Sequence, residues 1–151
     1  MTPPTPVTAP APSREAAMWS GVLLLHARVE SRLATALQRR HGIGLSEYRA
    51  LGHLAAAPAA ELRMQELADR LGLNQSSVTR LVARLQTAGF AYRDVCPDDK
   101  RGVYTVITED GRARHAAASG TYEEVLRSAL AEAAADPQLA ATVTALQPAD
   151  G

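Results

Sequence analysis

The stretch MQELADRLGLNQSSVTRLVARLQTAGF, residues 64–90, contains two short apolar repeats separated by a tight turn. In each repeat the apolar residues recur three, four and seven positions after the first, a spacing that places them on one face of a helix. They are Met64, Leu67, Ala68 and Leu71, then Val78, Leu81, Val82 and Leu85. Gly72 suits a left-handed residue ending the first helix, Asn74 is a good N-cap for the second, and Gly89 closes that second helix. The stretch therefore predicts a helix-turn-helix.

The second of these helices has a polar face without a carboxylate. Opposite its apolar stripe lie Ser76, Arg80, Ala83 and Thr87, with Ser77 and Arg84 flanking them, and no Asp or Glu occurs between Arg70 and Arg93. Small side chains allow close approach to the DNA major groove, hydroxyls donate to phosphates or base edges, and arginine can bridge guanine O6 and N7. A merely solvated helix face would show a similar pattern, so the helix alone leaves both interpretations open.

The apolar period changes to two after this helix. FAYRDV (90–95) alternates, CPDDKRG (96–102) has turn chemistry, and VYTVIT (103–108) is β-branched and aromatic, so we expect a hairpin with Lys100 and Arg101 at its tip. A hairpin in this position is the wing of a winged helix, and an arginine at its tip can enter the minor groove. Asp98 or Asp99 either braces that arginine by a bidentate bond or is an incidental charge of a polar turn.

The regions on either side are predicted to be helical. A helix is expected from Arg14 to about Arg40, and its apolar surface is wider than one stripe, which indicates a second packing partner. HGIG (41–44) ends it, and Ser46 is expected to cap the next helix. Thr108 is expected to cap a long helical region, followed by a short helix that begins at Asp136 and Pro137.

These elements give a mainly α fold with a small β-hairpin, which is a winged helix-turn-helix between N- and C-terminal helices. The expected parts are a disordered proline-rich tail (1–13), an N-terminal helix (14–44), a DNA-binding lobe (45–112) and C-terminal helices (113–151).

Composition limits the classes of protein that fit. The formal net charge is zero and 46% of the 151 residues are hydrophobic, which is typical of a folded domain. The charges are unevenly placed, because the centre is basic whereas residues 121–151 are mostly acidic. No apolar run approaches the roughly 20 residues that span a bilayer, and the tail has no export-signal pattern. With Cys96 as the single cysteine, the expected location is a reducing cytoplasm.

The sequence resembles the MarR (multiple antibiotic resistance regulator) family of bacterial winged-helix transcription factors. The resemblance lies in residues 64–90 and in RDVCPDDKRGVYTVITEDGR (93–112). It implies a homodimer with interlocking terminal helices that binds a pseudo-palindromic double-stranded DNA site, chiefly as a repressor. It also implies that Asp99 orients Arg101 into the minor groove, and that the recognition helix uses Ser76, Ser77, Thr79, Arg80 and Arg84. Two positions depart from the family pattern, Arg63 in place of a capping Ser or Thr and Cys96 in place of an Asp.

Members of that family bind small, often phenolic or anionic, effectors between the dimerisation helices and the DNA-binding lobe. In this chain Trp19, His26, Tyr48, Arg49 and His53 fall in the corresponding elements. Each of them is as easily explained by a structural role.

Other functions have weaker support in the sequence. No catalytic or phosphate-loop motif is present, so neither an enzyme nor a bound cofactor is expected, and the scattered histidines show no metal-ligand spacing. The alternatives are a winged-helix module that binds an acidic protein partner, and a redox or metal sensor on the same fold. In the second alternative, oxidation of Cys96 would displace the wing.

Overall fold

The computed structural model describes residues 1–95 and 102–149, and the predictions for Cys96, Asp99, Lys100 and Arg101 concern residues outside these ranges. The helices and strands are α1 (Arg14–His41), α2 (Leu45–Ala56), a short 3-10 turn (Pro58–Ala60), β1 (Glu61–Arg63), α3 (Met64–Leu71), α4 (Gln75–Thr87), β2 (Ala91–Val95), β3 (Val103–Ile107), α5 (Glu109–Ala135) and α6 (Ala140–Leu146).

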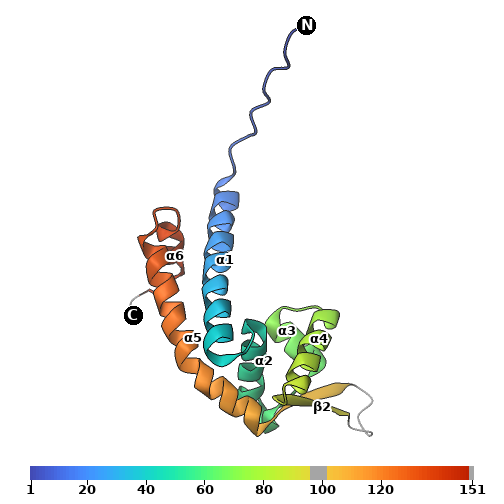
Figure 1. The fold of residues 1–151 in the computed structure, drawn as a ribbon. Helices are drawn as coiled ribbons and strands as arrows, with labels where there is room; N and C mark the ends of the chain where they lie inside the picture. The colour runs from blue at the N-terminus through green and yellow to red at the C-terminus, as the bar shows by residue number, and fades with distance from the viewer. Residues whose placement is uncertain (96–101, 150–151) are drawn as a thin grey trace.

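The elements form two parts, which we call the stalk and the lobe (Figure 1). The stalk consists of α1, α5 and α6, with α1 and α5 packed along each other. The lobe consists of α2, α3, α4 and the small sheet, and it lies at the end of the stalk where α1 finishes. Residues 1–13 form no helix or strand and are exposed. None of the helices within the described residues is both long and apolar enough to cross a membrane.

The helix-turn-helix is confirmed at the residues that were predicted to form it. Gly72 ends α3 in the left-handed conformation, with φ of 67°, and its N–H donates to the carbonyls of Ala68 and Asp69. Asn74 caps α4, because its Oδ1 accepts the N–H of Ser77 at 2.9 Å. The C-cap of α3 and the N-cap of α4 are only two residues apart, so together they fix the angle between the two helices.

The hairpin is confirmed and is extended by a strand that the sequence pattern missed. β2 and β3 pair antiparallel with Ala91 opposite Ile107 and Val95 opposite Val103. On the other side of β3, β1 pairs antiparallel and gives the order β1-β3-β2. A strand of three residues is too short for a recognisable alternation, so only its partner β3 defines it.

Two helix starts differ in how well they were predicted. The Thr108 hydroxyl accepts the N–H of Gly111 at 3.1 Å, which confirms it as the cap of α5. The predicted cap of α2 is wrong, because Gly44 is its N-cap and the N–H of Gly44 donates to Glu47 Oε2 at 3.1 Å. Burial of Leu45 draws the first turn inward, so Ser46 lies within that turn and is exposed.

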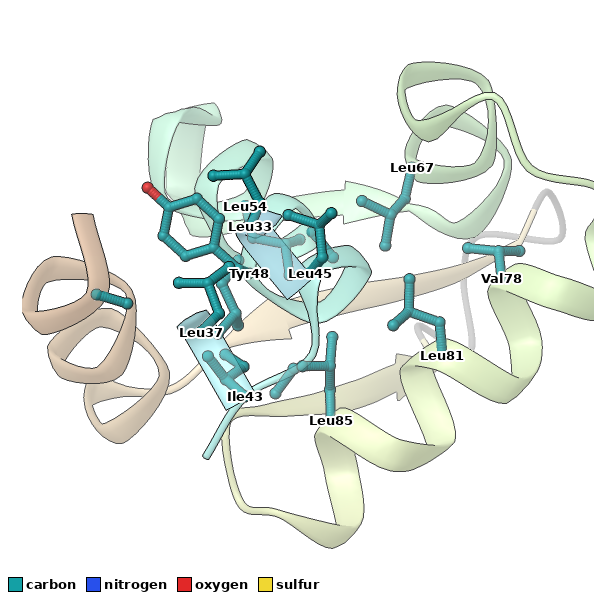
Figure 2. Close-up of a cluster of buried hydrophobic side chains, with 14 of the residues drawn as sticks. Leu33, Leu37, Ile43, Leu45, Tyr48, Leu54, Leu67, Val78, Leu81 and Leu85 are labelled. Carbon is teal, nitrogen blue, oxygen red and sulfur yellow. The ribbon is translucent and has the colours of Figure 1, made fainter. Parts of the chain in front are cut away.

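One hydrophobic core joins the stalk to the lobe (Figure 2). Leu33 and Leu37 of α1 pack in the same cluster as Leu67 of α3 and Leu81 of α4, and none of the four is more than 1% exposed. The far part of the stalk differs, since large apolar side chains stay exposed there: Met18, Trp19, Leu23, Leu24 and Leu146. The width predicted for the apolar surface of α1 is thus present, and in a single chain part of it is uncovered.

Candidate nucleic-acid interface

The polar face of α4 is exposed along its whole length. Val78, Leu81, Val82 and Leu85 are buried at 1% exposure or less. On the outer side Ser77 is half-buried and the remaining candidates are exposed, namely Ser76, Thr79, Arg80, Ala83, Arg84 and Thr87. The helix therefore presents the small and cationic surface that its sequence predicts.

The hydroxyls on this face are partly engaged by the helix itself. Ser76 Oγ donates to the capping Asn74 Oδ1 at 3.0 Å, and Thr79 and Thr87 donate to main-chain carbonyls four residues earlier at 2.8 and 3.0 Å. All three residues nevertheless remain exposed. Direct donation to a base or phosphate would require these hydroxyls to rotate.

The two arginines of α4 have different surroundings. Arg84 Nε donates to Glu47 Oε1 of α2 at 3.1 Å. Within residues 1–95 and 102–149, by contrast, Arg80 has no ion-pair or hydrogen-bond partner. Packing thus brings the carboxylate of Glu47 beside a helix that has no acidic residue of its own. The sequence pattern does not reveal this contact, because Glu47 and Arg84 are 37 positions apart along the chain.

Two open grooves flank α4, one on each side. The larger, of about 630 Å³, lies towards α3 and the hairpin, and its walls include Gln75, Thr79 and Arg93. The smaller, of about 240 Å³, lies towards α2 and is lined by Ser46, Leu73, Ser77, Arg80, Leu81 and Arg84. The helix therefore stands as a ridge whose two flanks carry different side chains.

Arg63 occupies the N-cap of α3, where the family pattern has Ser or Thr, and it makes no side-chain cap. Its Nε donates to the hydroxyl of Tyr104 on β3 at 3.0 Å, and its guanidinium lies 5.6 Å from the centre of that ring. Loss of a cap costs about 1 kcal/mol. The contact with β3 instead ties the start of α3 to the sheet.

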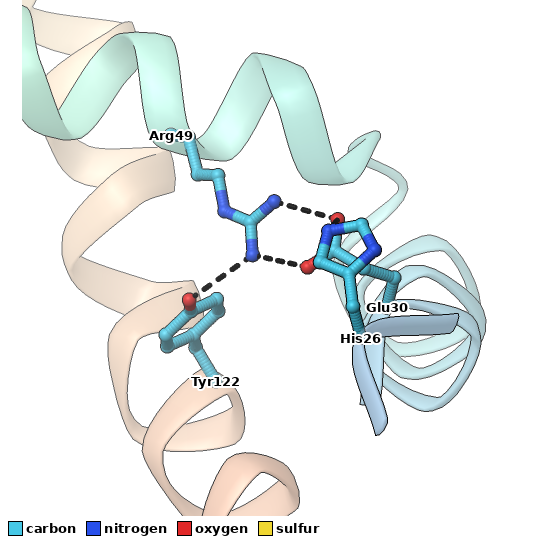
Figure 3. A network of polar contacts seen from close by, with 4 residues as sticks. All are labelled: His26, Glu30, Arg49 and Tyr122. Atoms are coloured by element: carbon cyan, nitrogen blue, oxygen red, sulfur yellow. Dashed lines mark hydrogen bonds and ion pairs between the residues drawn. The ribbon is translucent and has the colours of Figure 1, made fainter. Parts of the chain in front are cut away.

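The effector candidates fall at the junction of the stalk and the lobe. Arg49 of α2 forms a bidentate pair with Glu30 of α1, at 2.8 and 2.6 Å, and its Nη2 donates to the Tyr122 hydroxyl of α5 at 3.4 Å (Figure 3). His26 Nε2 lies 3.8 Å from Glu30. Residues from three helices are thus joined in one polar network.

An aromatic stack lies beside this network. The Tyr48 ring lies between those of His115 and Tyr122, with centroid distances of 4.7 and 4.8 Å. Tyr48 is 8% exposed, so the stack is part of the core of the junction. Sequence reasoning missed Glu30, His115 and Tyr122, although the seven-residue spacing of the last two on α5 does place them on one helix face.

The other two effector candidates are less closely tied to this cluster. Trp19 is 59% exposed and lies seven positions before His26 on α1. His53 is half-buried on α2. Neither takes part in the ion pairs and ring stacks that join Arg49 and Tyr48 to the stalk.

Packing shifts the pKa of the Glu30 carboxyl and that of the His115 ring at the junction. The hydrogen bond from Arg49 lowers the pKa of Glu30 below its ordinary value, although burial opposes the shift. Burial lowers the pKa of His115. Glu30 is therefore charged and His115 neutral at neutral pH, and the ion pair and the stack are both intact.

The acidic C-terminal region is paired with the first helix of the same chain. Arg28 pairs with Asp136, Arg32 with Glu132, and Arg40 with Glu124 at 3.5 Å. The sequence alone shows that residues 121–151 are mostly acidic but not what they contact. In the structure, these three carboxylates bind arginines across the interface of α1 with α5 and the turn after it.

The described residues contain no group of three or more His, Cys, Asp or Glu placed to hold a metal ion.

The comparisons with known proteins point to one family. A model described as the MarR family matches residues 41–102. The chain is also similar to an uncharacterized HTH-type transcriptional regulator, YkoM, of Bacillus subtilis (strain 168), with 33% identity over 73 residues. This match covers 48% of the chain and 46% of that protein, so the chain spans about half the length of the curated relative it matches.

Two solved structures from Streptomyces coelicolor match over almost the whole chain. Sco3205, a MarR family transcriptional regulator in complex with DNA, has 26% identity and a TM-score of 0.74, covering 95% of this chain and 94% of that one. AbsC, another MarR family transcriptional regulator, has 23% identity and the same TM-score, covering 93% and 95%. These similar proteins are transcription regulators rather than enzymes, and AbsC shows the shared fold.

Proposed function

The chain belongs to the MarR family of winged-helix proteins, and from this premise we propose that it is a sequence-specific, double-stranded DNA-binding transcription regulator. The exposed face of α4 is the main support. It carries Arg80 without a partner among the described residues, and a β-hairpin follows the helix directly. Such a helix suits the major groove and such a hairpin suits the adjacent minor groove. As a regulator of a bacterial chromosome it would act in the cytoplasm.

The acting species in this proposal is a homodimer. In addition to the exposed apolar residues of α1 and α6, the stalk has an apolar groove of about 380 Å³ between α1, α5 and α6, whose lining includes Leu25, Leu130, Val143 and the exposed Leu146. A patch of this kind on a folded chain marks an interaction site. A second copy covering it would place two copies of α4 on a pseudo-palindromic site with half-sites about one helical turn apart.

We also propose that the protein is a repressor and that a small molecule controls its binding to DNA. The junction network supports it, because Arg49 and the Tyr48 stack connect the lobe to the stalk that would hold the dimer together. A phenolic or anionic compound that binds among these residues, Trp19, His26 and His53 would favour a dimer with wrongly spaced recognition helices. Operator affinity would then fall by the difference in ligand affinity between the two states.

The wing contributes to the proposal through its sequence alone. We retain Asp99 as the brace of Arg101 in the minor groove and Lys100 as a neighbouring cation, with Cys96 as a candidate redox-sensitive thiol.

The deciding experiment is a fluorescence-anisotropy titration against the DNA upstream of the protein's own gene and against a scrambled duplex of equal length. The salt concentration should be about 0.15 M, so that surface electrostatics are screened as in a cell. A preference of about a thousandfold or more for the upstream duplex is expected for specific regulation. Equally weak binding to that duplex, to a duplex selected from a random pool and to the scrambled duplex would contradict the proposal. That result would favour a module whose arginine face binds an acidic protein.

A further inference from the structure

Ser46 has no role in capping or packing that accounts for its position. It lies in the first turn of α2, one residue after Leu45, while Gly44 and Glu47 complete the helix start between them. Ser46 is exposed, and its hydroxyl has no hydrogen-bond partner among the residues that the structure describes. The hydroxyl is therefore available to a molecule outside the chain.

The smaller groove places this hydroxyl across from the cationic flank of α4. Its polar lining consists of Ser46 on α2 with Ser77, Arg80 and Arg84 on α4. The Glu47 carboxylate accepts one hydrogen bond from Arg84, through Nε, and another from the N–H of Gly44. Two guanidinium groups and one neighbouring carboxylate leave the groove cationic, and Glu47 fixes the direction of Arg84.

The position of the groove relative to α4 indicates which part of a duplex it would meet. Ser76 and Ala83 lie on the outermost ridge of the helix, at about 170° and about 150° from its buried stripe when residues are spaced by 100°, and Arg80 lies at about 150° on the side of the groove. Ser77 and Arg84 lie on the flank beside the groove. A helix in the major groove has a sugar-phosphate backbone on either side, so flank residues are nearer to phosphates than to base edges.

We propose that the groove lined by Ser46, Ser77, Arg80 and Arg84 binds a phosphate of the DNA backbone. In this arrangement α2 contacts the duplex through Ser46, and Arg80 and Arg84 supply affinity that does not depend on sequence. Base discrimination then falls to the ridge of α4. The inference rests on the proposed DNA-binding function and adds a second helix to its contact surface.

The substitution Ser46→Asp tests the groove without threatening the fold. A carboxylate in the first turn of a helix is favoured by the helix dipole, so α2 should form as before. In the groove it would repel a phosphate. The matched control is Ser31→Asp, which makes the same charge change at an exposed serine of the stalk.

Binding should be measured by anisotropy with a duplex selected by the wild-type protein from a random pool and with its scrambled form. For Ser46→Asp we expect the Kd of both duplexes to rise by about tenfold, and the slope of log affinity against log salt to shrink by about one. Ser46→Ala should weaken both less, and Ser31→Asp should change neither.

Three results would overturn the inference. Affinities for Ser46→Asp that equal those of Ser31→Asp would show that no phosphate occupies the groove. A loss confined to the selected duplex would show that α2 reads bases. Failure of the wild-type protein to bind either duplex would instead remove the proposed function itself, so the two failures are distinguishable.

Discussion

Three arginines of the stalk and Arg80 of the lobe have opposite surroundings. Along the stalk, Arg28, Arg32 and Arg40 each face a carboxylate of α5 or the turn after it. On the exposed face of the lobe, Arg80 faces no carboxylate among the described residues. Arginine therefore serves internal contacts in the three stalk pairs, and in Arg84 of the lobe, whereas Arg80 remains available to an external anion.

This difference explains how a chain with zero formal net charge can suit a polyanion. Exposed ion pairs contribute only about 0–1 kcal/mol each, so the stalk pairs add little stability singly and mainly cancel charge. An unpaired arginine adds little to folding but retains its full attraction for phosphate. The arrangement of partners, rather than the sum of charges, decides which surface can bind DNA.

The largest expected effect is on stability. It tests whether the stalk and the lobe share one core and differ only in their surfaces. Leu33 in the stalk and Leu81 in the lobe belong to one core and are 0% and 1% exposed. Leu33→Ala and Leu81→Ala should each lower the free energy of unfolding by about 2–5 kcal/mol, since each leaves a cavity. Chemical denaturation at fixed protein concentration, followed by circular dichroism and Trp19 fluorescence, should show one shared transition. Two separate transitions would mean that the stalk and the lobe unfold independently.

The next effect tests the contrast between the arginines directly. Arg80→Gln should weaken binding to selected and scrambled duplexes by about tenfold, because one phosphate contact is lost. Its free energy of unfolding should stay within about 0.5 kcal/mol of wild type, as for surface substitutions in general. Arg32→Gln, which removes the partner of Glu132, is the matched control and should leave both affinities within about twofold. Equal losses of DNA affinity from Arg80→Gln and Arg32→Gln would contradict the proposed difference between these two arginines.

A smaller effect concerns the pair that joins the two parts. Glu30→Gln should lower the free energy of unfolding at pH 7 by about 1 kcal/mol, less than a buried pair would, because the Arg49 and Glu30 side chains are 33% and 27% exposed. The pKa of Glu30 is lowered in the folded chain by the hydrogen bond from Arg49. Its stabilising contribution is therefore complete above the ordinary value of 4.5 and is lost as the pH falls through the lower folded pKa.

Denaturation at pH 7 and pH 3 checks this dependence. The difference between wild type and Glu30→Gln should shrink at the lower pH, since Gln does not titrate. Glu123→Gln is the control, because Glu123 is exposed and has no ion pair within the described part of the chain. A difference for Glu30→Gln that stays constant with pH would show that the charge of Glu30 does not stabilise the junction.

The smallest effect is expected in the stalk. Arg40→Gln breaks the pair with Glu124, whose side chains are 52% and 69% exposed, and should cost about 0–1 kcal/mol of unfolding free energy. Any difference from wild type at low salt should vanish near 1 M salt, where the Debye length is about 3 Å. A larger loss that persists at high salt would mean that stalk pairs stabilise the fold as well as cancel charge.

The amino-acid sequence by itself determined the features that depend on neighbours along the chain. The apolar periods of α3 and α4, the left-handed Gly72 and the caps at Asn74 and Thr108 all act within a few residues, so local propensity and capping suffice to predict them. The exposed face of α4 follows from the same period. The hairpin follows from the change of period after Gly89, and the family resemblance rests on these same segments.

Tertiary structure alone decided the contacts between distant residues. Glu47 reaches Arg84, Glu30 pairs with Arg49, Tyr48 stacks between His115 and Tyr122, and β1 exists because β3 lies beside it. It also moved the start of α2 to Gly44 and left the hydroxyl of Ser46 exposed, because burial of Leu45 outweighed the capping preference of serine. The physical reason is common to all of them: each depends on which surfaces the core brings together, and local sequence preferences do not encode that choice.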